Sequence, residues 1–163
     1  MIILWSLQEQ QATRPISDNN ASRKFNNLAY DTQIKDLKPL LGFDMFQDLI
    51  QNPTTTANTL LLSGGTYTYN GITYQFEGLK KVLCYLFYAN YVMDNLQDTF
   101  HGFVTQNTED STAASSGDKK NLRDQNHEIA MQHWVDCKHF IECNYANYPY
   151  FNCRTQNNRL ITL

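Results

Sequence analysis

The sequence lacks a dominant charge and a long hydrophobic run. Across 163 residues, 13 lysines and arginines stand against 16 aspartates and glutamates, for a net charge of −3. The basic residues are scattered, whereas non-specific nucleic-acid binding requires a clustered basic patch. The longest apolar run, residues 82–93, contains Cys, Tyr and Asn and falls short of the ~20 residues that span a bilayer. The composition therefore excludes a nucleic-acid-binding monomer and a membrane-spanning chain.

Signals for secretion and for a disulfide framework are also missing. Residues 1–7 are apolar, but they lack a basic start and are too short for a signal-peptide core. The four cysteines, Cys84, Cys137, Cys143 and Cys153, are unevenly spaced, and a chain of this length buries enough surface to fold without cross-links. We therefore expect reduced thiols and a cytoplasmic site of synthesis.

Catalytic signatures are scarce. There is no Gly-x-Ser-x-Gly elbow, and residues 63–66 lack the lysine and spacing of a phosphate-binding loop. The cluster that most resembles an active site is His133, Cys137, His139 and Cys143. At about 100° per residue, the first two and the last two lie on separate helix faces, so they cannot close one tetrahedral zinc site. We expect no catalytic residue, no metal and no cofactor.

Aromatic residues are abundant: ten tyrosines and nine phenylalanines accompany only seven glycines. Tyrosine has an apolar body and a polar tip, which suits a surface that meets another protein. The same residues would equally fill the core of a modest helical domain. The length is that of a single domain, residues 1–163.

Residues 17–50 predict two helices joined by a corner. Ser17, Asp18 or Asn19 is expected to cap the first helix. Its apolar face is expected to contain four residues that recur at helical spacing: Tyr30, Ile34, Leu37 and Leu41. Pro39 is expected to end or bend this helix, because the residue before a proline avoids the α region. The structural corner comprises Pro39, Leu40, Leu41 and Gly42.

The strongest local turn signal is Asn70-Gly71, which predicts a type I′ β-hairpin between residues 67–69 and 72–74. We expect Tyr67, Tyr69 and Tyr74, together with Asn70 and Gly71, to contact a neighbouring subunit or a tail-side protein. The alternative is that the hairpin folds back on the helices.

The remainder predicts a buried helix, a flexible loop, a long helix and a tail. The buried helix carries Leu79, Val82, Leu83, Leu86 and Phe87. Residues 105–117 are polar and without periodicity, as in a flexible loop, and Asp118 is expected to cap a long helix ending before Pro149. Residues 1–15 form an N-terminal arm and residues 154–163 a C-terminal tail. The tail ends in a predicted strand that comprises Arg159, Leu160, Ile161, Thr162 and Leu163. This strand would dock either on its own domain or on the sheet edge of a partner.

In its order of parts the chain resembles the head–tail connector (adaptor or neck-ring) proteins of tailed phages, including those of Bacteroidetes phages. The order is helix, Lys38-Pro39-Leu40-Leu41-Gly42 corner, short helix, apolar helix, polar loop, long helix and extended tail, and the likeness is strongest over residues 17–49 and 77–143. The hairpin has no counterpart in that pattern.

The resemblance implies a mainly α fold: a small antiparallel helix bundle with one β-hairpin and extended N- and C-terminal segments. It implies a virion protein whose copies form a ring beneath the portal protein, above further neck or tail proteins. DNA would pass through the bore without sequence-specific binding, and residues 159–163 would grip the portal. No membrane partner is implied.

Two other classes are left open by the sequence. One is a small cytoplasmic helical regulator or adaptor that binds another protein through an aromatic surface. The other is an enzyme using Cys137 or the His/Cys helix, which predicts a thiol of depressed pKa or a bound metal.

Overall fold

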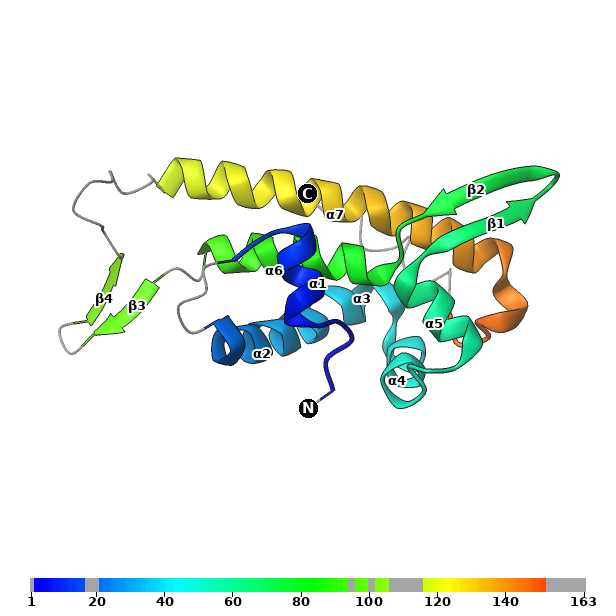
Figure 1. The fold of residues 1–163 in the computed structure, drawn as a ribbon, viewed down its shortest axis with the longest axis horizontal. Helices are drawn as coiled ribbons and strands as arrows, with labels where there is room; N and C mark the ends of the chain where they lie inside the picture. The colour runs from blue at the N-terminus through cyan, green and yellow to red at the C-terminus, as the bar shows by residue number, and fades with distance from the viewer. Residues whose placement is uncertain (1, 17–20, 94–95, 100–101, 106–115, 152–163) are drawn as a thin grey trace.

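The computed structural model describes residues 2–16, 21–93, 96–99, 102–105 and 116–151 (Figure 1). It is mainly α, an antiparallel helix arrangement with a projecting β-hairpin, as predicted. The elements in chain order are α1 (Leu7–Thr13), α2 (Ala21–Thr32), η1 (Gln33–Leu37), α3 (Lys38–Leu41), α4 (Phe43–Gln51), α5 (Thr56–Ser63), β1 (Gly65–Tyr69), β2 (Ile72–Phe76), α6 (Leu79–Met93), β3 (Leu96–Thr99), β4 (Gly102–Thr105), α7 (Ser116–Cys143) and η2 (Tyr145–Asn147).

The centre of the fold is the antiparallel pair α6 and α7, which lie side by side (Figure 1). The buried face of α7 comprises Ala130, Trp134, Cys137, Phe140 and Ile141. Most of the apolar residues predicted for the central helix are buried in α6: Leu79, Val82, Leu83, Leu86, Phe87 and Val92. This confirms the prediction, because a helix that is apolar nearly all round is covered on several sides. Tyr85 and Tyr88, also expected there, are half-buried, and Met93 is 45% exposed.

The corner departs from the prediction. Pro39 neither ends the helix nor marks its boundary, because α2, η1 and α3 run on without a break to Gly42, where φ is +83°. η1 is a π-helix, in which the Lys38 N–H donates to the Gln33 carbonyl five residues back. This wider turn precedes the proline, which then occupies the first turn of α3, where its missing N–H is tolerated. The helix therefore ends at the glycine instead.

The same π-turn changes the buried face of the helix. Tyr30 and Ile34 were predicted to face the core, but they are 37% and 38% exposed. Leu37 and Leu41 are buried as predicted. Upstream of the turn the buried positions are instead Phe25, Ala29, Thr32 and Gln33. The expected caps, Ser17, Asp18 and Asn19, lie outside the described residues.

The N-terminal arm is docked, and its second half is helical. Ser6 and Glu9 form a capping box that starts α1. This helix was not predicted, because the residues after position 7 are mostly polar. The indole of Trp5 packs edge-on against Phe25 and Phe87, with ring centroids 5.6 and 6.1 Å away. The buried side chain of Gln33 accepts from the Leu4 N–H at 2.7 Å and donates to the Ile2 carbonyl at 3.0 Å.

The predicted hairpin is confirmed, with Tyr67 opposite Tyr74 and Tyr69 opposite Ile72. The positive φ values at Asn70 and Gly71, 51° and 77°, are those of a type I′ turn. The hairpin extends past the end of the helices (Figure 1).

Two glycines hold the base of the hairpin. A Cβ on Gly64 would lie 2.5 Å from the carbonyl oxygen of Phe76, and one on Gly78 would lie 2.4 Å from the nitrogen of Gly64. The two chain segments therefore approach at a distance that only glycine permits.

Three features were not predicted or differ in extent. A helix, α5, follows residues 53–55, and a second antiparallel pair, β3 and β4, follows α6. α7 begins at Ser116, so Asp118 lies in its first turn rather than capping it. Of the predicted loop, residues 106–115 lie outside the described part of the chain. α7 ends before Pro149, as predicted.

Candidate interaction surfaces

The hairpin joins the bundle through an aromatic junction. Tyr67 stacks on Tyr74 at 5.3 Å between ring centroids, and its hydroxyl is hydrogen-bonded to Nδ1 of His139 on α7. Beneath them, Phe76 stacks on Phe140 at 4.2 Å. All three predicted contact tyrosines thus reach this intramolecular junction, Tyr69 with its ring edge-on to His139 at 6.3 Å between centroids.

Burial, together with like-charge repulsion from the nearby Cys143, raises the pKa of Tyr67 to about 12. The phenol therefore keeps its proton at neutral pH while it is hydrogen-bonded to Nδ1 of His139.

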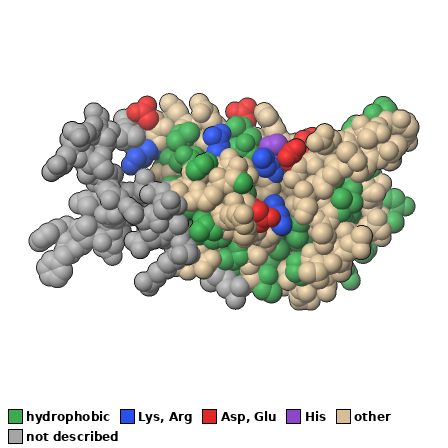
Figure 2. Space-filling model, in the orientation of Figure 1, with side chains coloured by type: hydrophobic (Ala, Val, Ile, Leu, Met, Phe, Trp, Pro, Cys, Tyr) green, Lys and Arg blue, Asp and Glu red, His purple; other side chains and the backbone are tan. Residues whose placement is uncertain are grey.

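The hairpin tip is the exposed part of this element. Tyr69 is 43% and Ile72 57% exposed, and Asn70 and Gly71 lie between them. The segment 65–76 contains no charged residue, and in Figure 2 neither blue nor red appears on it. Exposed hairpins in proteins commonly carry charges that discourage pairing with another chain. The tip is therefore suited to contact another protein surface.

The two His/Cys pairs of α7 lie in different environments. His133 stacks on Tyr85 of α6 at 5.6 Å, whereas His139 lies 3.7 Å from the Cys143 sulfur beside the hairpin. Within the described part of the chain, no three His, Cys, Asp or Glu side chains are grouped so as to hold a metal. Burial raises the pKa of Cys137 to about 12, which is opposite to the shift that a nucleophilic thiol requires.

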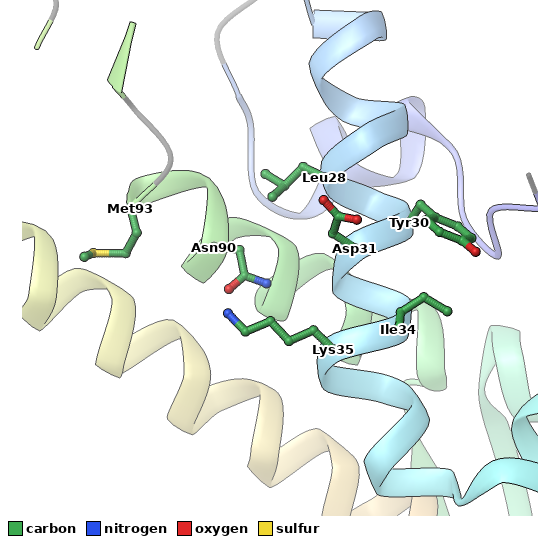
Figure 3. A pocket seen from close by; sticks show the side chains of 7 residues that line it. All are labelled: Leu28, Tyr30, Asp31, Ile34, Lys35, Asn90 and Met93. Carbon is green, nitrogen blue, oxygen red and sulfur yellow. The ribbon is translucent and has the colours of Figure 1, made fainter. Parts of the chain in front are cut away.

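A groove of about 620 Å³ opens between α2–η1 and the C-terminal end of α6. Figure 3 shows Leu28 and Lys35 directed toward α6, with the Lys35 amine reaching toward Asn90, whereas Tyr30 and Ile34 extend from the other side of the helix. Among the described residues, the lining comprises Leu28, Tyr30, Asp31, Ile34, Lys35, Asn90 and Met93. The groove thus combines apolar walls with one acidic and one basic side chain.

A smaller recess of about 280 Å³ lies between η1, α6 and α7. Three of its charged groups are already partnered: Asn90 donates to Asp36 at 2.7 Å, and Arg123 pairs with Asp124 at 2.6 Å. Lys35 and His127 complete the polar rim. The mixture of signs makes this recess a weak site for a phosphate.

Further apolar side chains are exposed on other elements. Phe43 at the start of α4 is 62% exposed, Val135 on α7 is 61%, and Tyr145 and Tyr150 beyond α7 are 76% and 56%. Tyr148, by contrast, is buried and donates to the Ala57 carbonyl at 2.7 Å. The aromatic segment after α7 therefore both covers the core and presents side chains to solvent.

The remaining predicted site residues lie in two places. In the corner, Pro39 is exposed, Leu40 and Gly42 are half-buried and Leu41 is buried. Arg159, Leu160, Ile161, Thr162 and Leu163 lie outside the described residues. Sequence reasoning missed the groove, because Tyr30 and Ile34 were assigned to the core and nothing in the pattern marked the π-turn.

None of the helices in the described part of the chain is long and apolar enough to cross a bilayer.

Neither a curated protein nor a solved structure matches the chain. A family model does match, over residues 37–161, and its description is "Family of unknown function (DUF6712)". Because the match covers more than half of the chain, the protein belongs to the DUF6712 family.

Proposed function

We propose that the protein is a structural virion component that forms a ring joining the capsid portal to the tail and lets DNA pass. The observation that carries this proposal is the distribution of exposed apolar side chains over separate elements: the hairpin tip, the α2–α6 groove and Phe43 at the start of α4. Rings are built from heterologous contacts, in which two different patches of one subunit meet. A monomer has no need of several such patches.

The order of the helices supports the same proposal. A helix leads through the Lys38–Leu41 segment to Gly42, then to short α4, to apolar α6 and to the 28-residue α7. This is the order on which the resemblance to head–tail connectors rests. The hairpin between α5 and α6 is an addition to it.

The charge distribution is compatible with a bore through which DNA slides. Three described cations pair with carboxylates: Lys80 with Glu9, Arg123 with Asp124 and Lys138 with Glu142. Neutralised cations do not hold phosphates strongly, because affinity for the DNA backbone grows with each unpaired positive charge that it meets. The proposal therefore includes passage of DNA and no sequence-specific binding.

The proposed contact with the portal uses residues 159–163. Phe151, the last described residue, packs against Trp134 on α7, with 6.3 Å between ring centroids. The twelve residues that follow can span up to ~40 Å when extended, which is long enough to leave the subunit. Added to a sheet edge, this strand would be held by backbone hydrogen bonds.

A second function is favoured by Tyr145 and Tyr150, the most exposed aromatic side chains beyond α7. As part of a helical regulator, they would anchor a partner protein in a monomeric or dimeric complex. Tyrosines are enriched among residues that dominate binding energy.

Quantitative mass spectrometry of purified particles tests the ring proposal. We expect a copy number equal to that of the portal, or an integer ratio to it. A protein abundant in infected cells and absent from particles would overturn the proposal and favour the regulator. Deletion of residues 159–163 should leave ring formation intact and abolish co-purification with the portal. A matched control, replacement of the same five residues by Gly-Ser repeats, separates loss of sequence from loss of length.

A further inference from the structure

The hairpin lies at one end of the described fold (Figure 1), and the groove lined by Asn90 and Met93 lies toward the other end of α6. The hairpin adjoins the N-terminal end of α6 and the groove its C-terminal end, at Asn90 and Met93. The 15 residues of α6, at 1.5 Å each, separate the two by ~20 Å. A hairpin that points away from the bundle cannot fill the groove of its own subunit.

The two surfaces are chemically matched. The tip presents one aliphatic and one phenolic side chain, Ile72 and Tyr69, without any charge nearby. The groove offers apolar walls for the first, and the Asp31 carboxylate as an acceptor for the Tyr69 hydroxyl. Both surfaces expose apolar side chains, and the groove adds one acidic and one basic group.

We propose that the hairpin tip of one copy inserts into the α2–α6 groove of the next copy. This inference rests on the proposed function, for which it names the subunit contact. The contact is heterologous, since tip meets groove, so repetition produces a ring when the rotation closes and a filament when it does not.

The area of the tip argues for a closed assembly over a dimer. Tyr69 and Ile72 together expose ~200 Å², judged from the 150–250 Å² that one aromatic side chain buries. A stable pairwise interface buries about 800 Å² on each partner. One such contact is therefore too small to hold two copies together as a dimer. In a closed ring each copy is held on two sides, and the contact that closes the ring forms within one assembly, which stabilises all of the contacts.

Site-specific cross-linking of the full chain tests the contact. Cys143→Ser and Cys153→Ser leave the buried thiols Cys84 and Cys137 in place. Ile72→Cys and Lys35→Cys are then introduced into separate copies of this variant. With a short bismaleimide, we expect an adduct in the mixture of the two variants and less than a tenth as much in either alone. A mixture of Ile72→Cys with Val135→Cys, on the exposed side of α7, is the control and should give no adduct above that background.

A charge-insertion pair gives an independent measurement. Ile72→Asp at the tip and Ile34→Asp in the groove should each weaken self-association about 10–100-fold, by sedimentation or light scattering. Thr66→Asp at the base of the same hairpin and Val135→Asp on α7 add the same charge elsewhere, and should stay within about twofold of the parent. Circular dichroism confirms that each variant is folded.

The outcomes separate this contact from the ring itself. Equal adducts with Lys35→Cys and Val135→Cys, or no adduct at any protein concentration, overturn the tip-in-groove contact. If the protein is nevertheless present in particles at the portal's copy number, the proposed function stands and a different subunit contact holds the ring. If it is absent from particles, the proposed function fails whatever the cross-linking shows.

Discussion

The Tyr67 hydroxyl and Nδ1 of His139 are hydrogen-bonded across the junction between β1 and α7. The residues are 72 positions apart in sequence, and the same tyrosine ring also packs edge-on against Phe140 at 5.1 Å. A two-stranded hairpin is marginal on its own in water, so its direction relative to the bundle depends on this junction.

Tyr67→Phe should lower the free energy of unfolding by about 1 kcal/mol, because it removes the hydrogen bond and keeps the ring. The measurement is urea denaturation followed by circular dichroism. Tyr69→Phe, on the exposed tip, is the control and should change stability by less than about 0.5 kcal/mol. Equal effects of the two substitutions would mean that the bond to His139 contributes nothing.

Gln33→Ala should destabilise the protein by about 2–3 kcal/mol. The side chain is fully buried, and its loss leaves the Leu4 N–H and the Ile2 carbonyl without their partners. Hydrogen exchange should also rise selectively at residues 2–6. Gln132→Ala, at an exposed position of α7, should leave both quantities unchanged. If the exchange at residues 2–6 stayed as slow as in the parent, the N-terminal segment would be held by Trp5 alone.

Gly64→Ala should cost about 2–4 kcal/mol, and Gly42→Ala about 1 kcal/mol. Both glycines have nearly the same positive φ, +78° and +83°, so the backbone strain is common to the two substitutions. A Cβ at Gly64 would overlap the Phe76 and Glu77 backbone, whereas at Gly42 it meets nothing within 4 Å. The difference between the two losses of unfolding free energy therefore measures the cost of the overlap between a Cβ at Gly64 and the neighbouring backbone. Equal losses would show that the hairpin base can open without cost.

Stability should fall as pH rises above about 9. Burial raises the pKa of Cys84 to about 11 and that of Cys137 to about 12, from an ordinary value of 9.0. Above pH 9 the unfolded chain releases these protons and the folded chain retains them. The stabilising contribution is therefore complete below pH 9, and each thiol removes about 1.4 kcal/mol per pH unit above it.

The check is urea denaturation at intervals between pH 8 and pH 10.5. Cys137→Ala should flatten the slope above pH 9 by the contribution of one thiol, whatever it does to stability at pH 8. A slope identical to the parent's would show that Cys137 titrates normally in the folded protein.

The cysteines should also differ in reactivity. Iodoacetamide should modify Cys143, which is half-buried, before Cys84 and Cys137, which are buried. Burial raises the pKa of all three thiols, but only the two buried ones also lack access to the reagent. Peptide mapping by mass spectrometry at pH 8 gives the order of modification. Rapid labelling of Cys137 in the folded protein would indicate that the α6–α7 pair opens readily.

The elements that the sequence predicted well are those whose signals are local. Asn70-Gly71 is a turn signal complete in two residues, and α6 is apolar at so many positions that no choice of face was needed. The end of α7 follows from a proline nearby. Each of these depends on side chains adjacent in sequence, so no knowledge of tertiary packing was required.

The elements that escaped prediction depend on distant partners. The helix α1 is mostly polar, and its buried side chain, Gln10, donates a hydrogen bond to the Cys84 carbonyl 74 positions away. A sequence pattern does not reveal such an acceptor. The exposed positions of Tyr30 and Ile34 follow from one extra residue in the turn of η1, which a period of 3.6 residues does not represent.

The π-turn of η1 keeps two stretches of one helix on the same buried face. Phe25 and Ala29 face the core together with Leu37 and Leu41, although Ala29 and Leu37 are eight positions apart and two α-helical turns contain about seven residues. Removing one residue from Gln33–Leu37 would let α2, η1 and α3 join as a regular α-helix with the same four residues still facing the core. A single-residue deletion here should therefore be less harmful than one between Phe25 and Ala29, which would turn Phe25 by ~100° away from the core.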